Sequence, residues 1–212
     1  MTPMTGLEII TIPFYVWQAA VGKTFPAIDA VPSADWTLMG LNGLQNMGEK
    51  GVIIKHSAKY ETDPFRTLGD TGAWDVIRSS EDLTIEFELM DLTLETYAQA
   101  LPVGPYESTD IVKETVATQE VPGMKQMGLY RGVQVSEVAL LVRGPSPYLV
   151  NTYLQFEIPR CVQVADPIPT VSKKNAATLL FIYQSLMAGL SGVAGAPQRF
   201  GRLIAQTTAK SA

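Results

Sequence analysis

Polar and apolar residues alternate strictly over residues 83–89, within a strand-like run at 82–90, and the period then changes. On one side of the alternation stand Leu83, Ile85, Phe87 and Leu89, and on the other stand Thr84, Glu86 and Glu88. This period of two places the two sets on opposite faces of a β-strand. Over residues 92–101 the apolar positions recur instead at the three- and four-residue spacing of a helix stripe. The pattern predicts a strand that leads directly into a short α-helix, with Asp91 or Thr93 as the residue that caps its first N–H groups.

Strand-like runs recur along the rest of the chain, over residues 7–18, 35–40, 51–61, 130–142, 150–164 and 177–187. Segments rich in Gly, Pro, Asn and Asp separate them, among them VPSAD, NGLQNMGEKG, TDPFRTLGDTG and RGPSP. This layout predicts a mainly β fold, a β-sandwich or barrel-like subunit with one short flanking helix and long loops. At 212 residues we expect one domain spanning 1–212.

Two segments fit neither period. Residues 102–128 form a connection longer than compact domains usually contain, and such loops are commonly functional or disordered. Residues 188–212 form a C-terminal tail whose first part is rich in Gly and Ala. We assign no motif to either segment.

Two of the predicted strands look partly apolar on both faces. In residues 150–164 and 177–187, the second face carries residues such as Tyr153, Leu180 and Ile182. A sheet with water on one side would alternate more cleanly. We therefore expect the second face to meet protein, either a second sheet of the same chain or a neighbouring chain.

The charge balance narrows the choice of partners. Hydrophobic residues make up 46% of the chain and charged residues 17%, below the roughly 25% usual for soluble domains, so a protein partner is a natural cover for part of the surface. The formal charge of −5 disfavours a nucleic-acid reader, which typically carries a basic patch. Because Cys161 and His56 are the sole residues of their types, an internal disulfide and a conventional zinc site are excluded.

Candidate catalytic motifs are weak throughout. Gly22 to Thr24 read GKT, but a phosphate-binding loop needs a glycine five residues earlier, where Trp17 stands. His56 lies in a strand pattern without a recognisable nucleophile, and Cys161 lies in a strand-like run typical of a buried, inert thiol. We expect no enzyme activity, no cofactor and no metal.

Two apolar stretches raise the question of a membrane. Residues 1–22 contain no Lys or Arg and are interrupted by Glu8, so we interpret them as a strand and not as a signal peptide. Residues 176–198 are uncharged, but serines, glycines and Gln184 dilute the roughly 20 apolar residues that a span requires. We predict a buried strand followed by a Gly-rich loop there, with a transmembrane helix as the alternative.

Three phrases taken together resemble the tail tube (major tail) proteins of long-tailed bacteriophages. They are DWTLMG at 35–40, the strand-to-helix segment RSSEDLTIEFELMDLTLETYAQAL at 78–101, and LLVRGPSPY at 140–148. Closing strands near FEIPR and ATLLFIY follow in the same order, so the resemblance covers most of residues 1–187. It does not extend to the 102–128 loop or to the tail after Met187.

The resemblance implies a structural virion protein made in the host cytoplasm and located in the phage tail. Such subunits close into hexameric rings, and the rings stack into a tube. The tube holds a tape-measure protein, meets initiator and terminator proteins at its ends, and lets DNA pass without specific binding. The competing hypotheses are a component of a related secretion tube, an adhesin-like β-rich binding module and, with less support, a small membrane-anchored protein.

Two sets of residues become candidate assembly positions under this resemblance. Thr84, Glu86 and Glu88 would line an acidic lumen along which DNA slides without sticking, or else face outer solvent. Arg66, Asp70 and Trp74, in the loop 62–74, would reach the adjacent ring, or else belong to an ordinary surface hairpin.

Overall fold

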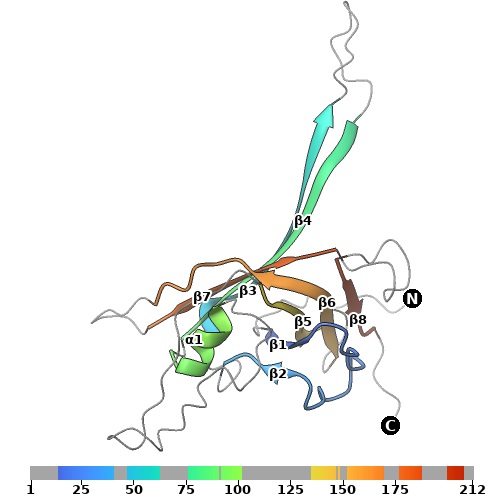
Figure 1. Ribbon diagram of the computed structural model, residues 1–212. Coiled ribbons are helices and arrows are strands. Elements are labelled where there is room, and N and C mark those ends of the chain that lie inside the picture. Colours follow the sequence, from blue (N-terminus) through green and yellow to red (C-terminus); the bar gives the residue numbers. More distant parts are fainter. Residues whose placement is uncertain are drawn as a thin grey trace, which may run out of the picture.

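The computed structural model describes residues 14–40, 47–62, 76–90, 92–101, 135–146, 148, 152–169, 177–187 and 200–207. Over these residues the protein is mainly β, with one antiparallel sheet of eight strands and one short helix (Figure 1). The elements in chain order are β1 Tyr15–Ala20, β2 Thr37–Leu38, β3 Met47–Thr62, β4 Val76–Leu89, α1 Leu94–Ala100, β5 Glu137–Pro145, β6 Tyr153–Gln163, β7 Leu179–Ser185 and β8 Arg202–Ala205. The prediction of a mainly β fold with one helix is confirmed.

The strands pair in the order β2-β1-β5-β6-β7-β4-β3, and β8 pairs separately with β6. One edge of β6 pairs with β5 along most of its length. The other edge is shared, because residues 161–163 pair with β7 whereas residues 154–157 pair with β8. The centre of β6 therefore joins two parts of the sheet.

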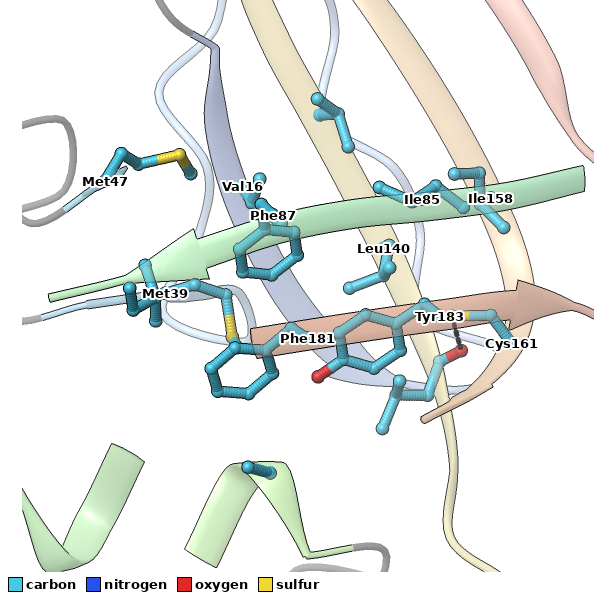
Figure 2. Close-up of a cluster of buried hydrophobic side chains, with 14 of the residues drawn as sticks. Val16, Met39, Met47, Ile85, Phe87, Leu140, Ile158, Cys161, Phe181 and Tyr183 are labelled. Carbon is cyan, nitrogen blue, oxygen red and sulfur yellow. Dashed lines mark hydrogen bonds between the residues drawn. The ribbon is translucent and has the colours of Figure 1, made fainter. Parts of the chain in front are cut away.

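A single hydrophobic cluster fills the inner face of this sheet. Val16 of β1 and Phe87 of β4 belong to the same cluster, although three strands separate β1 from β4 in the sheet order. The sheet must therefore curl so that its distant strands share one core, as the side chains in Figure 2 show. Stacked rings dominate the β4–β7 side: the Phe87 and Phe181 centroids lie 5.2 Å apart, and those of Phe181 and Tyr183 lie 6.3 Å apart.

The start of helix α1 is determined by a capping residue in its local sequence, and the helix packs against one end of this core. Thr93 is the N-cap residue, and its hydroxyl accepts a hydrogen bond from the Thr96 amide at 3.1 Å. Of the two predicted caps, Thr93 is thus confirmed, and Asp91 lies outside the described residues. Ala100 is buried in the cluster, and Tyr97 packs against it.

A second, smaller cluster lies on the opposite face of the sheet. Ala19, Ala139 and Leu141 face outward from β1 and β5, and Trp36 covers them from the connection that runs back from β1 to β2. The Trp36 indole donates a hydrogen bond to the Thr24 carbonyl at 3.1 Å. Both residues belong to the connection between β1 and β2, so this bond stabilises its folded-back conformation. This cover is a loop and lies over β1 and β5. The covered second face was expected for residues 150–164 and 177–187 instead, where Tyr153 is 44% exposed.

One predicted turn is wrong. Residues 143–145 of RGPSP continue β5 instead of leaving it. Gly144 is required there because a Cβ atom would overlap the ring of Phe14. Pro145 is the last residue of the strand, where a missing N–H disturbs the ladder least.

Several strand ends also differ from the prediction. β4 begins at Val76 and not at residue 82, because its charged and serine-rich start is held by pairing with β3. β8 was not predicted at all, since four residues in the C-terminal tail carry no period of their own. Residues 1–13 of the expected opening strand, and the loop 102–128, lie outside the described residues.

The uncharged segment 176–198 contains the predicted buried strand. Leu179, Phe181 and Tyr183 of β7 point into the core, and residues 188–199 lie outside the described part. None of the helices in the described part is both long and apolar enough to cross a bilayer.

Candidate functional site

The polar residues of β4 share one face, as the alternation predicts. Ile85, Phe87 and Leu89 are buried in the core, while Thr84, Glu86 and Glu88 alternate with them as half-buried residues on the outer face. The face assignment within the strand follows from its period of two.

The neighbouring strands β3 and β7 place both apolar and polar residues beside these three residues. Glu86 lies directly between Ile53 of β3 and Ile182 of β7 in the sheet register. Thr84 lies between Lys55 and Gln184. The outer face therefore places a carboxylate between two isoleucines across the sheet, which the sequence of β4 alone does not reveal.

The two glutamates differ in how their charge is compensated. The Lys50 ammonium lies 3.3 Å from the Glu88 carboxylate, and this lysine is largely exposed, so the pair adds little stability. No charged partner is found for Glu86 among the residues that the structure describes. Within the described part of the chain, Glu86 thus has no ion-pair partner on its half-buried face.

Strands β3 and β4 continue as a two-stranded ribbon after β7 ends. The last pair between β4 and β7 is Thr84 with Gln184, whereas the β3–β4 ladder continues to Thr62 with Val76. Figure 1 shows the two strands projecting well away from the rest of the sheet. A hairpin of two strands is marginally stable alone in water, so this projecting ribbon is a candidate contact surface.

The ribbon carries exposed apolar residues beside a cluster of charges. Tyr60 is 59% exposed and Ile77 62%. Glu81 contacts both His56 Nε2, at 2.5 Å, and Arg78 NH1, at 3.1 Å. The hydrogen bond from His56 and the one from Arg78 hold the pKa of Glu81 below its ordinary value despite some desolvation.

The loop candidates Arg66, Asp70 and Trp74 lie outside the described residues. Their loop connects Thr62 and Val76, the residues at which the described ribbon ends.

A buried polar network lies on the outer face over β5 and β6. Gln155 is fully buried, and its side-chain oxygen accepts a hydrogen bond from Arg143 Nε at 2.8 Å. The remaining nitrogens of Arg143 donate to the carbonyls of Ala27 and Ala30, at 3.0 and 2.6 Å. Desolvation lowers the pKa of Arg143. Because all three nitrogens of the guanidinium find an acceptor, the network anchors the β1–β2 connection on the sheet.

The same network extends to the C-terminal strand through Glu157, which is 3% exposed. One oxygen of its carboxylate accepts from Gln155 Nε2 at 2.6 Å, and the other accepts from Arg202 Nε of β8 at 2.5 Å. Sequence reasoning missed this pair because 45 residues separate its members. The signal present in the sequence was a charged residue, Glu157, within a largely apolar strand-like run.

Cys161 is buried, as predicted for an inert thiol. Its sulfur donates to the Val138 carbonyl at 3.2 Å, and burial raises the pKa of the thiol. A raised pKa suppresses the nucleophilic thiolate.

Comparison with known proteins identifies no family for this arrangement: no protein-family model matches the chain, and no curated protein matches it.

Proposed function

We propose that this protein is the subunit of a phage tail tube, a structural virion protein that assembles into stacked hexameric rings. The observation that carries the proposal is the outer face of β4, where Thr84, Glu86 and Glu88 form an acidic row. The curled antiparallel sheet and the strand-to-helix order support it, because they agree with what the resemblance to tail tube proteins implies.

The acidic row would line the bore of the tube. Glu86 has no cation beside it among the described residues, so six copies per ring would present a repeated negative charge. DNA passing Glu86 is repelled, while Lys50 on the same face already has the Glu88 carboxylate as its counterion, 3.3 Å away, and Lys55 lies opposite Thr84. The flanking Ile53 and Ile182 present no donor to phosphate.

The partners follow from this assignment. They are further copies of the chain, a tape-measure protein in the lumen, and initiator and terminator proteins at the tube ends. The protein has no catalytic role, no cofactor and no metal in this proposal, and it resides in the tail of the virion after synthesis in the host cytoplasm.

Electron microscopy of the purified chain at low and high concentration tests the assembly. Hollow tubes or six-fold rings are expected at high concentration, and a reconstruction is expected to place Glu86 on the bore. Dispersed particles at every concentration, also after addition of preformed tail initiators, would contradict the proposal. A reconstruction with β4 on the exterior would contradict the lumen assignment alone.

A charge reversal tests the role of the acidic row. Glu86→Lys tubes are expected to retain a short double-stranded oligonucleotide in low salt and to release it as salt rises. Asp35→Lys is the matched control, because Asp35 is exposed and pairs with the exposed Lys23. Equal retention of the oligonucleotide by both variants would contradict the assignment of Glu86 to the lumen.

The loop at the end of the ribbon is proposed to contact the adjacent ring through Arg66, Asp70 and Trp74. Replacing Arg66 and Trp74 by alanine is expected to leave rings intact and to stop their stacking. Light scattering and microscopy measure the two steps separately. Normal tube growth by this variant would assign the loop to the free surface.

A further inference from the structure

We propose that the edge of β6 is a receptor for the C-terminal strand of a second copy of this chain, so that neighbouring subunits exchange β8. This inference rests on the proposed function for the presence of neighbours. It concerns residues 200–206 as the ligand and residues 153–157 of β6, together with Ser146 and Ser185, as the receptor, all of which are described.

The receptor recognises the strand by charge. Glu157 is almost fully buried, and Arg202 is the cation that pairs with it, at 2.5 Å. The Arg202 side chain is 51% exposed, so only the carboxylate of this pair is buried; removing the arginine would leave that buried carboxylate without its cation, which is unfavourable. An arginine-bearing strand on this edge is therefore favoured over an empty edge.

The receptor also recognises the strand by shape and hydrogen bonding. Gly201 has φ = 132°, and a Cβ atom there would collide with the Glu157 carbonyl oxygen, so glycine is required before the arginine. The Ser185 hydroxyl donates to the Phe200 carbonyl at 3.1 Å. At the other end, the Ser146 hydroxyl donates to the Gln206 carbonyl at 3.1 Å. Three separate contacts thus fix the register of one short strand.

β8 is held by these directional contacts and not by core packing. Its ladder pairs with Leu154 to Glu157 of β6, and Leu203 is 55% exposed. Among the described residues, none in the two buried clusters comes from β8. Such a strand can leave its edge without opening the hydrophobic core.

The chain length between β7 and β8 permits exchange. Residues 188–199 connect the described segments, and a stretch of that length spans up to about 40 Å when extended. A strand from a neighbour makes the same contacts as the chain's own strand, which is why exchange of an identical element is a low-cost route to association. Within a ring, the neighbour's strand is also present at high effective concentration.

Disulfide trapping distinguishes exchange from an internal strand. Leu154 and Ala205 are directly opposed in the β6–β8 register, so Leu154→Cys with Ala205→Cys places two thiols across the contact. The sample is assembled, imaged for tubes and then oxidised. Cys161 is buried and does not compete. Chains linked into a ladder on a non-reducing denaturing gel are expected.

The control pair is Gln18→Cys with Thr37→Cys. These residues oppose each other across β1 and β2, and the described segment 14–40 joins them without a break, so their disulfide must be internal. A ladder from the β6–β8 pair alone supports exchange. Internal disulfides from both pairs overturn it, and so does the absence of any β6–β8 disulfide. Tubes seen before oxidation keep the proposed function intact in either case, whereas their absence counts against the proposed function itself.

Mixing two single variants provides an independent test of strand exchange. Arg202→Glu and Glu157→Arg each break the pair within one chain, while a mixture restores it between chains. Recovery of assembly in the mixture supports exchange. Recovery only when both substitutions are in one chain overturns it.

Discussion

Arg160 of β6 holds the Glu137 carboxylate of β5 with two arms of its guanidinium, Nε and NH2, each 2.5 Å from one carboxylate oxygen. Two-point pairing of this kind is stronger and more directional than a single-point contact. The hydrogen bonds from Arg160 lower the pKa of Glu137, against a smaller effect of desolvation. The pair sits where β5 and β6 meet, beside the register shift at which two residues of β6 oppose one residue of β5.

This pair gives the stability a defined pH dependence. A carboxylate whose pKa is lower in the folded state stabilises the fold above its ordinary pKa of 4.5 and loses that contribution as pH falls below it. In the Glu137→Gln variant, the free energy of unfolding is therefore expected to fall less steeply with decreasing pH below 4.5 than in the unchanged protein. Urea unfolding between pH 7 and pH 3 measures both slopes, with the exposed Glu49→Gln as the control. Equal slopes in all three proteins would contradict the prediction.

The ring stack of the core is expected to dominate the stability. Phe181 is fully buried and stacks on both Phe87 and Tyr183, which also stack on each other, and Phe181→Ala removes its two stacking contacts and leaves a cavity. We expect a loss of about 3–5 kcal/mol in the free energy of unfolding, measured by chemical denaturation. The control is Ile53→Ala, which replaces an aliphatic residue that is 41% exposed on the outer face. A loss for Phe181→Ala no larger than that of the control would show that the stack contributes little.

The contact between Gly144 and Phe14 predicts a non-additive pair of substitutions. Gly144→Ala forces the new methyl group into the Phe14 ring, at an expected cost of about 1–3 kcal/mol. In a Phe14→Ala background the ring is gone, so the same substitution is expected to cost much less. A double-mutant cycle measures this coupling. Strictly additive effects would show that the ring does not cover the glycine.

Thr93 is expected to set the stability of α1. Thr93→Ala removes the hydroxyl that accepts from the Thr96 amide and is expected to cost about 1 kcal/mol. Thr93→Ser keeps the hydroxyl and serves as the matched control. Thermal unfolding of the three proteins gives the comparison, and equal loss in both variants would point to the methyl group of Thr93 instead of the hydroxyl.

The sequence predicted those features that depend on local period. The alternation over β4 gave the correct buried face, and the spacing after it gave the helix and the Thr93 cap, because both signals come from residues close in the chain. The strand in 177–187 was also found, since its flanking residues are polar or small.

Features set by distant partners could not be predicted in the same way. The ribbon half of β4 has no alternation and depends on β3 for its pairing. Lys50 beside Glu88 and Arg202 beside Glu157 are 38 and 45 residues from their partners. The row of Thr84, Glu86 and Glu88 was therefore predicted as one face, but not its isoleucine flanks.

The buried thiol of Cys161 is a built-in probe for local opening of the sheet. The chain has one cysteine, it lies in β6 with no exposed surface, and its raised pKa leaves almost no thiolate at neutral pH. A thiol reagent can therefore react only after the C-terminal end of β6 separates from β5 and β7, with which Cys161 pairs, so the modification rate measures how often this part of the sheet opens.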